Sequence, residues 1–365
     1  MKHQTTRYGE IPFYKIGTFG NTADAFISKK LFLEYKTKYS FPKKGDILIS
    51  ASGTIGRAVI YDGKPAYFQD SNIVWIDNDE TLVKNDFLFY AYSNVKWNTE
   101  HTTILRLYND NFRNTLIPLP PLNEQSAIAN ILSTLDRYLH ALDALILKKE
   151  GVKKALSFEL LSQRKHLRGF NQAWQRVRLG DICEFGNGGA YETLIVENGN
   201  FKLISLNSVD IDGNLKNTMK RVNFYDNSLK QGDIVMVLSD VAHGDFLGLC
   251  AVIPSNDYVL NQRMGRLRIR NDCINILFLR LYINANQKYF KMQGQGSLQL
   301  NLSKKAIEDF EIPLPPLNEQ IAIANILSAL DHEIISLKNK KRQFENIKKA
   351  LNHDLMSAKI RVLKK

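Results

Sequence analysis

The segment IPLPPLNEQSAIANILSTLD, residues 117–136, returns almost unchanged as IPLPPLNEQIAIANILSALD, residues 312–331. The two copies differ only where Ser126 is replaced by Ile321 and Thr134 by Ala329. Their offset, 312 minus 117, is 195 residues, which is too long for a solenoid unit and suits a domain followed by a helix. The sequence therefore predicts two half-molecules in tandem.

Each copy predicts the start of a helix. In the first copy, Pro120 and Pro121 cannot continue a helix or a β-ladder and hold the preceding chain extended. Asn123 is the expected N-cap, because its side chain can accept from free backbone N–H groups of the first turn. Glu124 then lies at the positive end of the helix dipole. The second copy repeats all four residues 195 positions later, with Asn318 as its expected cap.

Beyond both starts, apolar residues recur every seventh position, which is the pattern of a coiled-coil seam. The predicted seam consists of Ile128, Leu132, Leu135, Leu139 and Leu142, and of Ile323, Leu327, Leu330, Ile334, Leu337, Phe344 and Leu351. Each helix is expected to run for about 40 residues, roughly 60 Å. If a pseudo-twofold axis relates the halves, the two helices must be antiparallel.

The composition is that of a globular protein, with 44% apolar and 24% charged residues. Forty-nine Lys and Arg against 37 Asp and Glu leave a net charge of +12, which favours a polyanionic partner but does not identify one. The three cysteines are isolated and lack CxxC spacing, so they predict neither a disulfide framework nor a metal site. The sequence shows no signal peptide and no apolar membrane span, and a cytoplasmic location is expected.

The segments between the helices are β-rich. Short β-type runs at residues 11–16, 46–50, 58–61 and 73–76 alternate with turns, and residues 86–93 form the one good candidate helix of the first domain. Lys44-Gly45-Asp46-Ile47 is matched by Gln231-Gly232-Asp233-Ile234 in the second domain. The second domain opens with WQRVRLGDICEF, residues 174–185, for which the first has no counterpart, so the first is expected to be shortened.

The expected fold class is α+β, with two β-rich domains separated by two long helices that form an antiparallel coiled coil, as a pseudo-twofold tandem repeat. The expected boundaries are 1–118 for the first domain, 119–168 for the first helix, 169–313 for the second domain and 314–365 for the second helix.

The WxxVRLGDI opening at residues 174–182, the variable β-rich domain, the IPLPPLNEQ segment and the long helix, all in tandem, resemble the specificity subunit of type I restriction-modification systems. The resemblance implies two target recognition domains, each reading one half of a bipartite site in double-stranded DNA. It also implies that the helix pair sets the spacing and docks two methyltransferase subunits, which are joined by restriction subunits. No cofactor is expected in this chain; S-adenosylmethionine belongs to the methyltransferase partner, and ATP and magnesium to the restriction partner.

Base-edge readout uses Arg or Lys for guanine and Asn or Gln for adenine, with Ser and Thr adaptable. In the second domain, the loop 294–301 and the alternating face that begins at residue 262 carry such groups, against the alternatives of a polar loop and a solvated strand face. A lone histidine is more often structural than functional. The candidates are Gln295, Ser297, Gln299 and Asn301, then Gln262, Arg263, Arg266 and Arg268, and His243.

The first domain offers equivalent candidates in three places. They are Ser52, Thr54 and Arg57; Gln69, Ser71 and Asn72; and Arg106, Asn109, Asn111 and Arg113. The SGTIG segment at residues 52–56 lacks the Lys-Ser/Thr of a phosphate-binding loop, so a nucleotide site is not expected and a plain hairpin is favoured.

No catalytic motif is evident: the chain shows neither a methyltransferase Pro-Pro-aromatic motif, nor a glycine-rich turn for adenosylmethionine, nor a paired-carboxylate nuclease motif. A non-catalytic recognition subunit is therefore expected. A stand-alone coiled-coil DNA-binding regulator and a structural scaffold remain alternatives.

Overall fold

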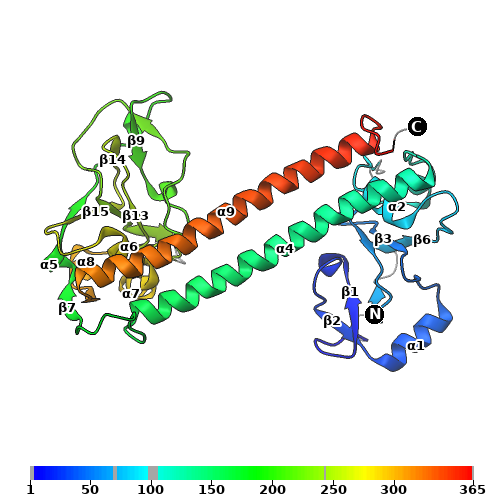
Figure 1. Cartoon of the computed structure of the whole chain (residues 1–365), viewed down its shortest axis with the longest axis horizontal. Helices are drawn as coiled ribbons and strands as arrows, with labels where there is room; N and C mark the ends of the chain where they lie inside the picture. Colours follow the sequence, from blue (N-terminus) through cyan, green and yellow to red (C-terminus); the bar gives the residue numbers. More distant parts are fainter. Residues whose placement is uncertain (1–3, 69–71, 98–105, 242–243, 364–365) are drawn as a thin grey trace. The chain divides into compact units, whose positions relative to one another are not determined.

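The computed structural model describes residues 4–68, 72–97, 106–241 and 244–363. The chain divides into two compact units: unit 1 contains residues 1–145 and 337–365, and unit 2 contains residues 146–336. Helices α4 (Leu122–Leu161) and α9 (Leu317–Met356) each contribute residues to both units (Figure 1).

Within its described residues, unit 1 contains two small sheets. One has the order β2-β1-β5, with β2 antiparallel and β5 parallel to β1, and comprises β1 (Ile11–Tyr14), β2 (Ala25–Ile27) and β5 (Tyr67–Phe68). The other is antiparallel with the order β4-β3-β6, and comprises β3 (Ile47–Ser50), β4 (Ala58–Ile60) and β6 (Ile73–Ile76). The short helices are η1 (Ile16–Thr18), α1 (Lys29–Lys38), α2 (Asn85–Tyr92) and α3 (Asn109–Arg113).

Unit 2 contains the same two sheets with additions. The first has the order β10-β9-β14 and comprises β9 (Phe201–Ile204), β10 (Arg221–Val222) and β14 (Tyr258–Leu260). The second has the order β13-β11-β15-β8 and comprises β8 (Cys183–Asn187), β11 (Ile234–Val237), β13 (Cys250–Val252) and β15 (Met264–Ile269). Two further pairs are β7 (Gln175–Arg178) with β17 (Glu311–Leu314) and β12 (Ser239–Val241) with β16 (Gln299–Asn301). The helices are α5 (Leu179–Ile182), η2 (Glu192–Leu194), η3 (Leu206–Ser208), α6 (Ile276–Ala285), α7 (Gln287–Gln293) and α8 (Lys304–Glu308).

The strand registers reveal that the two β-rich domains are copies of one design. Ile47 of β3 lies opposite Ile60 and Ile76, and Ile234 of β11 lies opposite Val252 and Leu267. The matched Gly-Asp-Ile segments therefore open equivalent central strands, which confirms the α+β tandem repeat. The copies diverge in sequence yet keep the same hydrogen-bonded framework.

Helix α2 confirms the helix expected at residues 86–93. Helices α1, α6 and α7 were not expected, because their segments were interpreted as part of β-rich domains. Helix α1 buries only Phe32. Its N-cap is Ser28, whose side-chain oxygen accepts from the Leu31 backbone N–H at 3.2 Å. A helix with one buried side chain has little apolar periodicity to detect.

The long helices begin at Leu122 and Leu317, each one residue before the Asn that was predicted as its N-cap. The Pro121 carbonyl accepts from the Gln125 backbone N–H at 2.9 Å, so α4 begins at Leu122. Pro316 and Gln320 repeat this bond at 3.0 Å. Asn123 and Asn318 therefore lie inside the first turn, and their prediction as N-caps is wrong. The proline takes the cap position because its carbonyl can accept the first helical bond while its missing N–H is not needed there.

Within each unit, α4 and α9 run antiparallel. In unit 1, Asp136 is ion-paired with Lys348, and Asp143 with Lys341 at 2.6 Å. Residue numbers therefore decrease along α9 as they increase along α4. In unit 2, Lys149 is paired with Glu333 at 2.8 Å, and Lys153 with Asp331. The pair Lys153–Asp331 is the counterpart of Lys348–Asp136 at the 195-residue offset, as a pseudo-twofold repeat requires.

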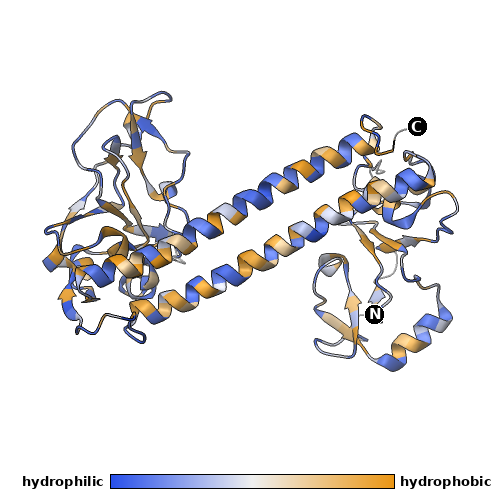
Figure 2. Cartoon of the chain, viewed as in Figure 1, coloured by the Kyte–Doolittle hydropathy of each residue, from blue (hydrophilic) through white to orange (hydrophobic). Residues whose placement is uncertain are grey.

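The seam residues lie on the inward faces of these helices, and Figure 2 shows hydrophobic positions alternating with hydrophilic ones along both. Buried seam residues are Ile128, Leu132, Leu142, Ile323, Leu327 and Ile334, and half-buried ones are Leu135, Leu139, Leu330, Leu337, Phe344 and Leu351. Tyr138 packs on Phe344 with ring centroids 4.7 Å apart. Burial of each large apolar side chain contributes about 1.5–3 kcal/mol, which favours the paired state.

Each unit closes its core around the start of one long helix and the end of the other. In unit 1, Ile128 and Leu132 of α4 pack with Leu355 of α9 and Phe87 of α2. The unit 2 core repeats this with Ile323, Leu327, Leu160 and Phe278. The helices are therefore integral to both cores.

A buried glutamine joins each long helix to its domain. Gln320 is 0% exposed; its amide N–H groups donate to the Pro315 and Cys273 carbonyls at 2.8 and 3.0 Å, and its oxygen accepts from the Asn275 backbone N–H at 2.8 Å. Asn275 is the N-cap of α6. Gln125 makes the same three bonds to the start of α2 in unit 1. Among the described residues, no helix is both long and apolar enough to cross a membrane.

Candidate nucleic-acid interface

In unit 2, three separate segments converge where the central strand β11 ends. Ser239 pairs with Asn301 across β12 and β16, and its hydroxyl donates to the Asn301 side-chain oxygen at 2.5 Å. The Leu238 backbone N–H donates to the Arg263 carbonyl at 2.9 Å, which brings Arg263 beside them. We call Ser239, Arg263 and Asn301 the polar corner of unit 2.

Unit 1 builds the same corner from Ser52, Asn72 and Arg106. Ser52 bridges to Arg106, and its hydroxyl donates to the Asn72 side-chain oxygen at 2.8 Å. The Ala51 backbone N–H donates to the Asn72 carbonyl at 2.8 Å, just as Leu238 does to Arg263 in unit 2. The backbone therefore fixes one residue from each of three segments at equivalent places in both units.

The corners present the same chemistry in a different order. The position of Asn72 in unit 1 is taken by Arg263 in unit 2, while the position of Arg106 is taken by Asn301. Arginine and asparagine make the bidentate contacts that distinguish guanine from adenine. Two sites of one geometry with exchanged side chains are suited to reading two different sequences.

Arg263 has the clearest features of a ligand-binding residue. It is exposed, and within the described residues no group forms a hydrogen bond or ion pair with its guanidinium. Its backbone has φ of 68°, which non-glycine residues rarely adopt. It borders a pocket of about 450 Å³ that is also lined by Gln299, Lys216 and Asn207. An exposed cation and amide groups around one recess can contact a phosphate or a base edge.

The loop 294–301 forms a hairpin beside this pocket. Gln295 and Asn301 exchange backbone hydrogen bonds at 3.0 and 2.9 Å, and Gly296 turns the chain with φ of 122°, a conformation that requires glycine. Ser297 lies exposed at the tip, and Gln299 lines the pocket. The hairpin thus places Gln299 in the pocket wall and Ser297 at its tip, while Asn301 lies at its base against Ser239.

Other predicted residues are occupied within the domain. Arg268 donates twice to Asp233, at 2.8 and 2.7 Å, and this bond raises the pKa of Arg268. Arg266 donates to Glu184 at 2.6 Å and to the Ser228 carbonyl at 3.0 Å. Gln262 donates to Glu192 at 2.7 Å, which lowers the pKa of that carboxyl. These three side chains hold strands and turns together, so we leave them out of the proposed interface.

The remaining candidates in unit 1 are scattered around the corner. Arg57 donates to the Phe19 carbonyl at 3.0 Å, Arg113 pairs with Asp110 at 3.4 Å, and Asn109 begins α3. Thr54 is exposed in the turn after β3, where Gly53 and Gly56 have positive φ. Gln69, Ser71 and His243 lie outside the described residues.

Sequence reasoning missed Ser239, Asn207 and Lys216. Ser239 could have been found, because extending the matched Gly-Asp-Ile segments by five residues aligns Ser52 with Ser239. No short-range pattern marks Asn207 or Lys216, which reach the pocket only through the fold.

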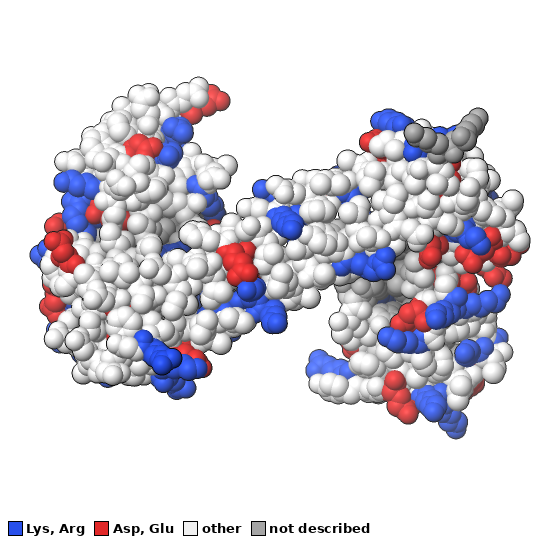
Figure 3. Space-filling view, in the orientation of Figure 1, with Lys and Arg blue, Asp and Glu red and all other residues white. Residues whose placement is uncertain are grey.

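Basic and acidic side chains are interspersed on the face shown in Figure 3. Within the described ranges, no group of three or more His, Cys, Asp or Glu side chains could hold a metal ion.

Comparison with known proteins gives concordant results. A family model described as "Type I restriction modification DNA specificity domain" matches residues 1–149 and 171–346. A putative type I restriction enzyme specificity subunit of Haemophilus influenzae is 63% identical over 137 residues, which cover 37% of this chain and 36% of that protein. That match spans about a third of the relative's length.

Longer similarities extend across both units. The type I restriction enzyme MjaVIII specificity subunit of Methanocaldococcus jannaschii is 29% identical over 365 residues, covering 93% of this chain and 84% of that protein. The crystal structure of a type I restriction-modification system S subunit from M. genitalium matches with a TM-score of 0.65 at 20% identity, covering 98% of this chain and 91% of that one. This likeness supports the fold.

Proposed function

Because this chain belongs to the family of type I restriction modification DNA specificity domains, we propose that it is the DNA-recognition subunit of a type I restriction-modification complex. Each β-rich domain reads one half of a bipartite site in double-stranded DNA. The boundaries that we propose are 1–118 and 169–313 for these domains, with the helical segments at 119–168 and 314–365.

The observation that carries this proposal is the pair of polar corners. Ser52, Asn72 and Arg106 in unit 1 are held by the same backbone bonds as their counterparts in unit 2. A duplicated scaffold that keeps its hydrogen bonds while exchanging Asn and Arg is the arrangement expected of two readers with different base preferences. The exposed Arg263 and the Gln299 hairpin are the proposed base-reading groups of unit 2.

The long helices are the proposed docking element for methyltransferase subunits. Their near-identical starts supply two equivalent places, one in each unit, which suits two copies of the same partner. The methyltransferases would supply the S-adenosylmethionine chemistry, and restriction subunits would use ATP and magnesium. In this proposal the chain carries no catalytic step of its own, and its DNA partner makes the cytoplasm its expected location.

The test is divided between the two surfaces. Methylated positions in a strain that carries the whole system would be mapped for the wild type, Arg263→Ala and Asn72→Ala. Arg263→Ala is expected to relax preference at one half-site by roughly 10- to 100-fold, corresponding to the 1–3 kcal/mol of a bidentate base contact. Asn72→Ala should relax only the other half-site.

Gln343→Ala, on the exposed face of α9, is the matched control and should leave both half-sites unchanged. Equal loss at both half-sites in either corner variant would contradict the assignment of one reader to each unit. Failure of the wild-type chain to co-purify with a methyltransferase would contradict the proposed role as a whole.

A further inference from the structure

Unit 2 contains a 14-residue segment, Trp174–Asn187, that closes its domain at three places. Strand β7 pairs with β17, α5 donates the Leu179 backbone N–H to the Phe310 carbonyl at 2.8 Å, and β8 extends the sheet beyond β15. The Trp174 indole N–H donates to the buried Glu319 carboxylate at 2.9 Å. This segment therefore works as a strap across the domain.

Unit 1 keeps the receiving groups for such a strap. Glu124 is the counterpart of Glu319 and is likewise buried, and residues 116–119 are the counterpart of β17. Strand β6 is the counterpart of β15. Within the described residues, however, β6 has no partner on the side that β8 occupies in unit 2, and residues 116–119 form no ladder.

Exposure of the apolar side chains shows the difference. Ile312 of β17 is 0% exposed beneath the strap, whereas its counterpart Ile117 is only half-buried in unit 1. Leu116 and Leu119, on either side of Ile117, are 94% and 58% exposed. Glu124 has Arg361 as its ion-pair partner at 4.0 Å, which is beyond hydrogen-bonding distance, where Glu319 has the indole of Trp174 at 2.9 Å. An exposed strand edge with apolar side chains is a template for adding another strand.

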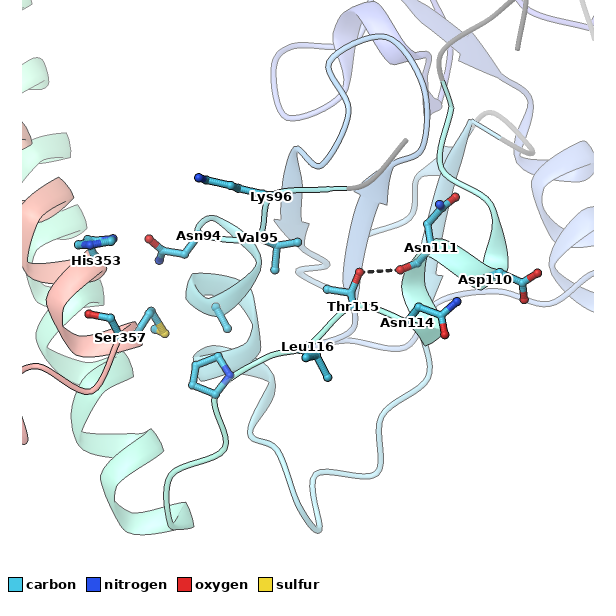
Figure 4. Close-up of a pocket in the computed structure, with 13 residues that line it drawn as sticks. Asn94, Val95, Lys96, Asp110, Asn111, Asn114, Thr115, Leu116, His353 and Ser357 are labelled. Carbon is cyan, nitrogen blue, oxygen red and sulfur yellow. Dashed lines mark hydrogen bonds between the residues drawn. The ribbon is translucent and has the colours of Figure 1, made fainter. Parts of the chain in front are cut away.

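The open edge borders a pocket of about 580 Å³. Figure 4 shows its lining: Asn94 and Lys96 follow α2, Asn114 and Leu116 follow α3, and His353 faces them from α9. Helix α3 and residues 114–116 are the counterparts of α8 and residues 309–311, and α5 of the strap packs on α8 and bonds to Phe310 in unit 2. The pocket and the unpaired residues 116–119 thus adjoin at the place that α5 and β7 of the strap occupy in the other unit.

We propose that unit 1 is a binding site for a tryptophan-led extended polypeptide segment with the pattern of Trp174–Asn187, supplied by a separate polypeptide. Its indole N–H donates to Glu124, its first strand pairs with residues 116–119, its helical turn fills the pocket and its second strand pairs with β6. This site is distinct from the polar corner and does not depend on DNA recognition.

A second copy of this chain is a poor donor of that segment. Leu179, Ile182 and Cys183 are 1%, 5% and 2% exposed, so the segment is part of the unit 2 core. Releasing it would expose three large apolar or sulfur-containing side chains and leave Glu319 without its indole partner. A separate segment with the same pattern incurs neither loss.

The test uses a labelled peptide of residues 172–187 with Cys183→Ser, titrated into the full-length protein and followed by fluorescence anisotropy. Saturable binding at micromolar concentration is expected. The peptide with Trp174→Ala, and the protein variant Glu124→Gln, should each weaken binding by about tenfold or more, because each removes the bond between the indole and the charged carboxylate. Glu34→Gln, an exposed carboxylate of α1, is the matched control and should bind the peptide like the wild type.

Hydrogen exchange of the wild-type protein locates the site even if Glu124→Gln fails to fold. Bound peptide should slow exchange of the Leu116, Ile117 and Leu119 amides and of β6. No binding at 1 mM peptide, or protection confined to unit 2, would overturn the proposal. A protein dimer that protects residues 116–119 without peptide and blocks peptide binding would assign the site to a second copy and overturn it as well.

Discussion

The buried glutamines at the helix starts give the sharpest test of how the helices and domains are coupled. Gln320→Leu keeps the side-chain volume roughly constant but removes three hydrogen bonds, to the Pro315 and Cys273 carbonyls and from the Asn275 N–H. Since Gln320 is 0% exposed, these backbone groups lose their partners in a buried place.

A buried backbone group without a partner costs about 1–3 kcal/mol, which for three groups gives roughly 3–9 kcal/mol. The lower half of this range is expected, because Cys273 is exposed and its neighbourhood can readmit water. Unit 2 comprises 191 residues (336 − 146 + 1), for which each kcal/mol shifts Tm by about 2–4 °C. A loss of about 3–5 kcal/mol therefore corresponds to roughly 6–20 °C.

The assay is urea unfolding followed by tryptophan fluorescence, with calorimetry for Tm. Trp174 reports on unit 2, where it lies against Phe278 with ring centroids 6.4 Å apart, and Trp75 and Trp97 report on unit 1. Gln125→Leu should produce a loss of the same size in unit 1. Gln343→Leu, at an exposed position of α9, should change stability by less than about 0.5 kcal/mol. If the free energy of unfolding of Gln320→Leu lies within about 0.5 kcal/mol of the wild-type value, the helix is not coupled to its domain through this side chain.

Three further outcomes are expected. Leu337→Asp places a charge on the half-buried seam and should lower both the stability of the helix pair and co-purification with a methyltransferase, whatever the DNA sequence. Gln299→Ala should change DNA preference alone. The same loss from both variants on every DNA sequence would contradict this separation. Asp233→Asn weakens the bidentate bond from Arg268 and should lower the free energy of unfolding by about 3–5 kcal/mol. Asp143→Asn, in the half-exposed pair with Lys341, should lower it by under about 1 kcal/mol. Equal effects would refute the structural role of Arg268. At pH 8, only the exposed Cys273 should react quickly with a thiol reagent in the native protein. The reason is that burial raises the pKa of Cys183 to about 12 and also raises the pKa of Cys250. Rapid reaction of three thiols before unfolding would be inconsistent with the unit 2 core.

The sequence alone determined the tandem repeat, the two long helices and their apolar seam. Each of these features depends only on a local or periodic pattern in the sequence. The patterns are a proline pair that ends one element, apolar residues at every seventh position, and a duplication that is visible without a structure. The short helices α1 and α7 escaped because each buries a single side chain, Phe32 or Phe290, which leaves little apolar periodicity to detect. Helix α6 was missed although its buried residues, among them Phe278 and Tyr282, recur at helical spacing. The predicted Asn caps failed because the local rule could not foresee that the preceding proline carbonyl would take the first helical bond.

Only the tertiary structure decided which polar side chains are free and which are occupied. Arg263, Arg266 and Arg268 look alike along the sequence, yet strand pairing brings carboxylates to the latter two and leaves Arg263 exposed beside Gln299. The strap shows the same principle, because the Trp174 segment is recognisable in sequence while its three docking places come from residues 78 or more positions away (265 − 187 = 78). A hydrogen bond between distant segments depends on where the fold places both partners, and no window of sequence contains that information.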